Sequence, residues 1–144
     1  MVDGRWSMID KDPRSLAKLI FCLMTNYQNL DAWNIGISLV SEIYEITSAF
    51  PKEELFGLVS QMRRAAISVP CNIAEGVGRQ SKKDTIHFLH IARGSIYETQ
   101  TLAHISKLNG YITKESTTSL SILIERSLQV TNGLINYYRN SKLR

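Results

Sequence analysis

Cysteine is scarce in this sequence, and neither of its two cysteines is placed for a cross-linked or metal-bound fold. Cys22 and Cys71 have no metal-ligand spacing to each other or to any of the three histidines. A secreted disulfide scaffold uses more cysteines in a shorter chain. The sequence therefore predicts two reduced thiols in a protein of the cytoplasm.

Long apolar runs are also lacking. The longest candidate, residues 19–24, falls far short of the ~18 residues that a membrane span needs. Asp3, Asp10 and Asp12 precede this run, which is the wrong flank for a signal peptide. We expect no contact with a membrane.

Motifs of catalysis and metal binding are absent as well. The chain has no Gly-x-Ser-x-Gly elbow, no Walker loop and no Glu-x-x-His or His-Glu-x-x-His pair. His87 and His90 have a spacing that could present both to one metal, but no such pattern surrounds them. A Ser/His/acid set assembled in space stays open. We predict no enzyme activity, no cofactor, no metal and no small-molecule substrate.

The length and composition are those of one globular domain. A chain of 144 residues with 44% hydrophobic and 21% charged residues can bury a core without cross-links. Residues 1–60 hold five Lys/Arg against eight Asp/Glu, whereas residues 61–144 hold twelve against five, a net charge of +7. This surplus indicates an anionic partner such as nucleic acid or, alternatively, solvated helix faces.

Apolar residues recur at helical spacing in four segments, and no segment alternates with the period of a strand. The helices are expected near residues 31–48, 52–74, 81–109 and 113–140. We predict an all-α fold, an antiparallel up-down-up-down four-helix bundle over residues 27–140. Residues 1–26 are a short N-terminal extension in this prediction, and residues 141–144 are a tail.

The helix ends carry recognisable signals. Asp31, Ser81 and Thr113 are the predicted N-caps, and Asn109-Gly110 is a predicted stop. Pro70 predicts a kink in the second helix, because it removes one backbone hydrogen bond. Met24 would serve as a start codon, so residues 1–23 fit an over-extended reading frame and are expected outside the folded domain.

The expected core faces follow the helical spacing. The first helix has one apolar stripe of Trp33, Ile37, Val40, Tyr44 and Thr47 and an adjacent one of Gly36, Leu39, Ile43, Ile46 and Phe50. The predicted seam of the fourth helix is Leu120, Leu123, Ser127, Val130, Leu134 and Tyr137, widened by Ile124 and Ile135.

A polar stripe is predicted on the far side of the second helix, since Met62 and Arg64 lie about 200° apart at ~100° per residue. An ordinary solvated face would be filled with Lys and Glu. Small hydrogen-bonding residues predict packing against another subunit, against the next helix through Arg93 or Glu98, or against a ligand. The predicted interface comprises Arg64, Ser68, Asn72, Glu75, Arg79 and Glu98.

Residues 76–83, GVGRQSKK, join a flexible turn to a helix N-terminus beside three cations. Such a place can hold a phosphate or a carboxylate, although a solvated turn is the plainer alternative. The predicted nucleic-acid contacts are Arg63, Arg64, Arg79, Lys82, Lys83 and Arg93.

Two long motifs carry a family resemblance. Residues 61–79 read QMRRAAISVPCNIAEGVGR and residues 88–98 read FLHIARGSIYE, while residues 31–33 and 50–54 fit the usual opening. Over about residues 27–140 the chain resembles the bacterial four-helix-bundle family of 23S rRNA intervening-sequence proteins. The chain departs from the family pattern in two ways. Residues 1–23 are an extension, and Cys71 stands where a small polar residue is more usual.

The resemblance implies a four-helix bundle that assembles as a ring-like homopentamer, with a biochemical role that is not established. The fold is similar to a basic pentameric accessory protein of diversity-generating retroelements, an analogy at the level of fold alone. We predict an oligomeric protein that binds RNA or DNA through a basic surface. The alternative is a scaffold that docks a partner protein without touching nucleic acid.

Overall fold

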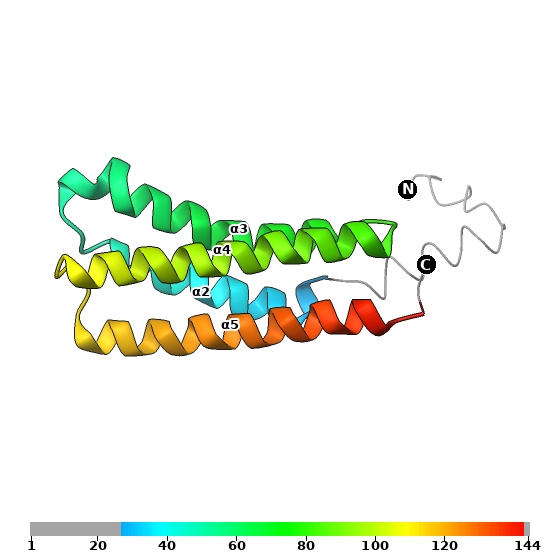
Figure 1. Cartoon of the computed structure of the whole chain (residues 1–144). Helices are drawn as coiled ribbons and strands as arrows, with labels where there is room; N and C mark the ends of the chain where they lie inside the picture. Colours follow the sequence, from blue (N-terminus) through cyan, green and yellow to red (C-terminus); the bar gives the residue numbers. More distant parts are fainter. Residues whose placement is uncertain (1–26, 143–144) are drawn as a thin grey trace, which may run out of the picture.

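Four helices form the structure, a computed structural model that describes residues 27–142 (Figure 1). They are α2 (Asp31–Thr47), α3 (Ser60–Val77), α4 (Lys82–Leu108) and α5 (Lys114–Asn140). No strand occurs in the described part of the chain. The predicted all-α four-helix fold is therefore confirmed, whereas the predicted extension of residues 1–26 lies outside the described residues.

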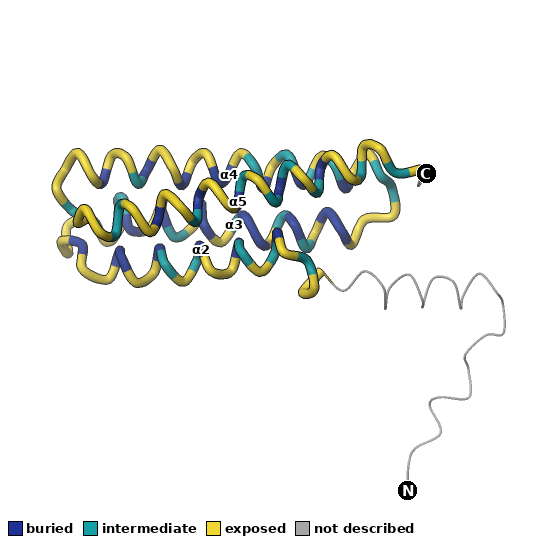
Figure 2. Tube along the Cα trace, turned by 90° about the horizontal axis from the view of Figure 1, so that it is seen from below, coloured by how far each residue is buried: buried dark blue, intermediate teal, exposed yellow. Residues whose placement is uncertain are grey.

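Neighbouring helices run in opposite directions. Ser95 of α4 bonds to Ser68 of α3, and eleven residues later Ser106 reaches back to Met62, so residue numbers rise along one helix as they fall along the other. The pairs α2–α3, α3–α4, α4–α5 and α2–α5 all pack together. This closed square buries one side of every helix, as the dark segments of Figure 2 show.

On α2 the second of the two apolar stripes forms the core. Gly36, Leu39, Ile43, Ile46 and Phe50 are all buried. In the first stripe only Thr47 is buried, and Ile37 and Tyr44 are about two-fifths exposed. The hydrophobic face is thus wider than the core needs, and its edge reaches the surface.

In the second half of α5 the most buried residues are shifted by about one position from the predicted seam. Leu120 and Ser127 are buried as expected, as are the widening residues Ile124 and Ile135. Val130 and Leu134 are partly buried and pack against the core, and Thr131 is fully buried beside them. Tyr137 is 61% exposed. Thr131 was not part of the predicted seam; its methyl group can pack against apolar neighbours, and its hydroxyl is fully enclosed.

The chain between α2 and α3 departs from the prediction of one helix starting near Lys52. Residues Lys52–Glu54 make a 3₁₀ turn and Leu55–Val59 a wider π-type turn. Gly57 has φ −100° and ψ −115°, outside helical values, so regular α-helix begins only at Ser60. The helix is continuous through Pro70, and a separate break in helical geometry lies at Gly57.

Two of the three predicted N-caps are confirmed. The Ser81 hydroxyl accepts from the Asp84 amide, and Thr113 accepts from Ser116 in the same way. At α2 the N-cap position belongs to Leu30, with no side-chain bond, and Asp31 is the first helical residue. Its carboxylate still suits the positive end of the helix dipole.

Candidate nucleic-acid interface

Three parts of the chain meet at one end of the bundle: the α3–α4 turn, the first turns of α4 and the last turns of α5 (Figure 1). Lys82 joins them directly. Its ammonium donates to the backbone carbonyls of Arg139, at 2.9 Å, and Ser141, at 2.8 Å. These carbonyls lie at the C-terminus of α5, where a cation also meets the negative end of the helix dipole.

This end carries the positive charge of the described chain. We define the basic end as residues 27–34, 75–93 and 132–142. It holds six Lys/Arg against three Asp/Glu, a net charge of +3, whereas the rest of residues 27–142 holds six against seven, a net charge of −1. The sequence asymmetry between halves is thus an asymmetry between the ends of the folded bundle.

Arg79 is held over the start of α4. Its guanidinium pairs with Glu75 one turn back and lies 4.7 Å from the ring centre of Phe88. The ring can approach because Gly76 lies beneath it without a side chain: a Cβ there would be 2.9 Å from the Phe88 Cβ. The Arg79 side chain is still 46% exposed, so its charge faces solvent.

On the other side of α4, two arginines link α4 to α5. Arg93 donates to the Asn132 side chain at 3.2 Å, and Arg139 lies 3.2 Å from Nε2 of His90. A guanidinium can only donate, so His90 accepts as a neutral imidazole. Burial lowers the pKa of His90, and the nearby Arg93, Arg139 and His87 lower it further, consistent with the neutral form.

Lys83 is an exposed cation of the basic end and has no bonding partner among residues 27–142. It follows Lys82, whose ammonium is already satisfied, and the two point in different directions on the helix because adjacent residues are about 100° apart. Lys142, also exposed, follows the end of α5.

The predicted nucleic-acid residues do not form one surface. Arg79, Lys82, Lys83 and Arg93 lie at the basic end, but Arg63 and Arg64 lie about four helical turns further along α3. Arg63 turns toward α2, where it donates to the Thr47 hydroxyl at 3.0 Å and covers the Tyr44 ring. The six residues are therefore divided between the basic end and the first turns of α3.

The polar stripe of α3 makes its central contacts within the chain. Asn72 donates to the carbonyl and hydroxyl of Ser68, and Ser68 accepts from Ser95 of α4 at 2.9 Å. Packing against the next helix was one of the predicted alternatives. The stripe does contact α4, but through Ser95 and not through Arg93 or Glu98. The exposed Arg64 and Glu98 have no bonding partner among the described residues.

Sequence reasoning missed the contribution of α5 to this end. Arg139 and Lys142 are distant in sequence from the α3–α4 turn. His90 lies on α4 and was considered only as a metal ligand. The predicted antiparallel topology contained the signal, because the end of a fourth helix returns to the turn between the second and third.

Across residues 27–142, no three His, Cys, Asp or Glu gather where they could hold a metal ion. None of the helices described is apolar over a length that could cross a membrane.

The fold and this surface define a class of protein: a small antiparallel four-helix bundle with one basic end. Residues 28–133 match the family described as 23S rRNA-intervening sequence protein. The chain belongs to this family, because the match spans most of its length, and the resemblance carried by the two long motifs is confirmed.

One similar solved structure is the crystal structure of a protein with unknown function from the S23 ribosomal protein family of Bacteroides thetaiotaomicron. It is 23% identical, with a TM-score of 0.68, and the alignment covers 73% of this chain and 95% of that one. At this identity the likeness shows the fold. No curated protein matches the chain. Neither description names a reaction.

Proposed function

We propose that the protein is a non-enzymatic nucleic-acid-binding protein whose basic end contacts the phosphate backbone of RNA or DNA. The observation that carries the proposal is the charge of +3 at that end beside −1 over the rest of the described chain. Phosphate contacts supply most sequence-independent binding to nucleic acid. A family named for an intervening sequence of 23S rRNA agrees with an RNA partner.

The structure separates cations that can bind directly from those already engaged. Lys83 and Lys142 are exposed. Arg79 is paired with Glu75, but an exposed ion pair of this kind is weak and can exchange for a phosphate. The Lys82 ammonium is used by α5 carbonyls, and Arg93 by Asn132, so these two add to the local potential without being the first contacts.

Fluorescence anisotropy with labelled structured RNA and duplex DNA tests the proposal across a salt series. The double variant Arg79→Gln/Lys83→Gln should bind all sequences more weakly, with the slope of log K against log salt reduced by about two. The matched control Lys52→Gln/Lys114→Gln removes two cations near the opposite end and should leave affinity unchanged. No affinity at low salt, or an equal loss in both double variants, would contradict the proposal.

We also propose that the chain assembles as a homo-oligomer, for which the family resemblance implies a ring-like homopentamer. On α4 the exposed residues Ile91, Glu98 and Ile105 lie seven residues apart from one another. On α3 the exposed residues Arg64 and Ile67 lie three residues apart. The three isoleucines are 38–39% exposed. An apolar face with two opposite, unpartnered charges suits contact with another protein surface; the alternative is that a different partner protein covers it. A strictly monomeric mass by light scattering would exclude the homo-oligomer.

A further inference from the structure

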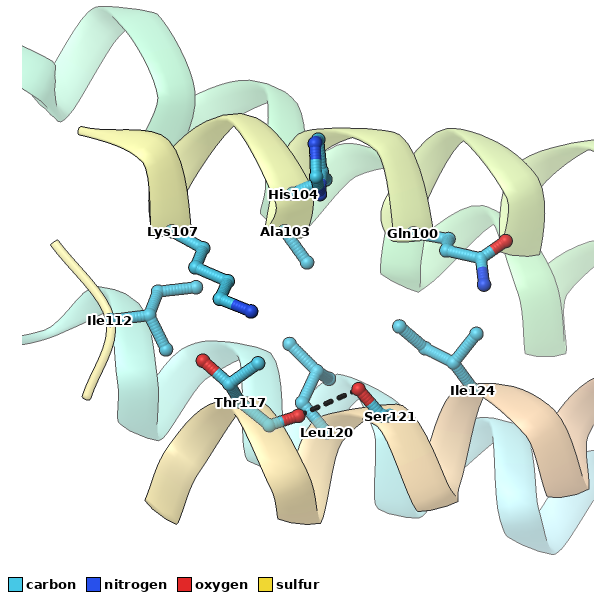
Figure 3. A pocket seen from close by; sticks show the side chains of 9 residues that line it. All are labelled: Gln100, Ala103, His104, Lys107, Ile112, Thr117, Leu120, Ser121 and Ile124. Carbon is cyan, nitrogen blue, oxygen red and sulfur yellow. Dashed lines mark hydrogen bonds between the residues drawn. The ribbon is translucent and has the colours of Figure 1, made fainter. Parts of the chain in front are cut away.

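A cavity of about 200 Å³ lies between α4 and α5, close to the turn that joins them (Figure 3). It belongs neither to the basic end nor to the apolar face of α3 and α4. Its floor consists of Ile112, Leu120 and Ile124, which are 9%, 2% and 3% exposed, together with Ala103. Because core side chains build this floor, folding itself sets the shape of the cavity.

The rim is polar and comes from both helices. Gln100, His104 and Lys107 stand on the α4 side and are exposed, and none of them has a bonding partner among residues 27–142. Figure 3 shows Lys107 and Gln100 reaching from α4 toward α5 over the cavity. The rim therefore offers an ammonium and an amide as free donors above an apolar floor.

On the α5 side the hydroxyl protons are already used. Ser121 donates to the carbonyl of Thr117 at 2.7 Å, and Thr117 donates to the carbonyl of Thr113 at 2.8 Å. No Asp or Glu lines the cavity, so Lys107 is its one permanent charge. The positive charge of Lys107 therefore favours an anion at its corner of the cavity.

The size limits the ligand. A dry cavity of ~150 Å³ is sufficient for benzene, so this one has room for a six-membered ring or a short alkyl chain with a small head group. We infer that the cavity binds a small monocarboxylate with an apolar body, such as an aromatic or short-chain carboxylic acid. The carboxylate lies at Lys107, and the apolar body covers Leu120 and Ile124.

Benzoate is the probe for this site, and benzyl alcohol is its neutral counterpart. In a titration followed by amide chemical shifts, benzoate should move resonances of residues 100–124 with a Kd of roughly 0.1–10 mM, the range expected for so small a ligand. Benzyl alcohol should bind several-fold more weakly because it cannot pair with Lys107.

Three variants distinguish binding at this site from general attraction of an anion to a basic protein. Lys107→Met should weaken benzoate about tenfold and leave benzyl alcohol unchanged, whereas Lys114→Met, a nearby cation outside the cavity, should change neither. Ser121→Leu should fill the cavity and weaken both compounds. Shifts confined to the basic end, or equal binding by the Lys107→Met variant and the unmodified protein, would overturn the inference.

Discussion

Gly76 shows how a single residue without a side chain shapes the basic end. A Cβ at this position would lie 2.9 Å from the Cβ of Phe88 and 3.1 Å from the carbonyl oxygen of Thr85. Both contacts come from α4, so the glycine lets α3 pack directly against the first turns of α4. Phe88 then lies under Arg79. The sequence could indicate Gly76 only as part of a helix stop, because its partner follows after a turn.

The variant Gly76→Ala should destabilise the protein by about 1–3 kcal/mol, since Phe88 and the α4 backbone would have to move. Gly133→Ala is the matched control, because it lies inside α5 with nothing within 4 Å of the new Cβ. Alanine there should stabilise by about 0.5–1 kcal/mol through its helix propensity. Denaturant unfolding measures both, and an unchanged free energy of unfolding for Gly76→Ala would show that the helices separate at no cost.

Among the elements, the helices with local signals were predicted well and the segment fixed by tertiary contacts was not. Ser81 and Thr113 cap their helices through residues three positions on, and such signals are complete in the sequence. Leu55, Leu58 and Met62 keep an apolar spacing across Gly57, so periodicity alone continues the helix where the backbone breaks. The break is stabilised from a distance: Tyr111, after α4, donates to Glu54 at 3.3 Å.

Glu54 holds this break from two sides. One carboxylate oxygen accepts from the Leu58 amide at 3.1 Å and the other from Tyr111. Glu54→Ala should therefore cost about 1–2 kcal/mol, as loss of a capping carboxylate does. Glu53→Ala is the control, because Glu53 is exposed and makes no hydrogen bond within the described residues; it should change stability by less than about 0.5 kcal/mol.

A titration of Tyr111 distinguishes loss of this contact from general loosening. Burial raises the pKa of Tyr111 above its ordinary value, and the charge and hydrogen bond of Glu54 raise it further. In Glu54→Ala the pKa should fall toward the ordinary value while burial keeps part of the increase. An absorbance titration that shows the same pKa in both proteins would mean that Glu54 does not contact Tyr111 in solution.

At the scale of the whole molecule, the sequence predicts the size of the positive charge surplus. It predicts only in part where the cations lie in the folded bundle. The surplus in residues 61–144 was evident from the sequence, and four of the candidate cations, Arg79, Lys82, Lys83 and Arg93, lie together at the basic end. Arg63 and Arg64 were grouped with them, yet α3 places these two residues about four turns away from the basic end. The cations of α5 joined the site only through the return of the chain to the same end.

The separated Arg64 provides the test of assembly. It lies on α3, and Glu98 lies on α4 between Ile91 and Ile105, both charges being exposed and without partners in the described chain. If copies meet through this face, Arg64→Glu and Glu98→Arg should each place like charges together and weaken the assembly, because such juxtaposition costs several kcal/mol. The double variant Arg64→Glu/Glu98→Arg should restore it, since it exchanges the two signs.

Light scattering of the eluting protein gives the mass of each variant, and Arg126→Glu, an exposed charge reversal on α5, should keep the mass of the unmodified protein. Loss of assembly in both single variants and recovery in the double variant would pair Arg64 of one subunit with Glu98 of the next. Loss without recovery would place both residues in the interface with different partners. An unchanged mass in both single variants would exclude this face, because reversed charges in a packed apolar contact cannot be neutral.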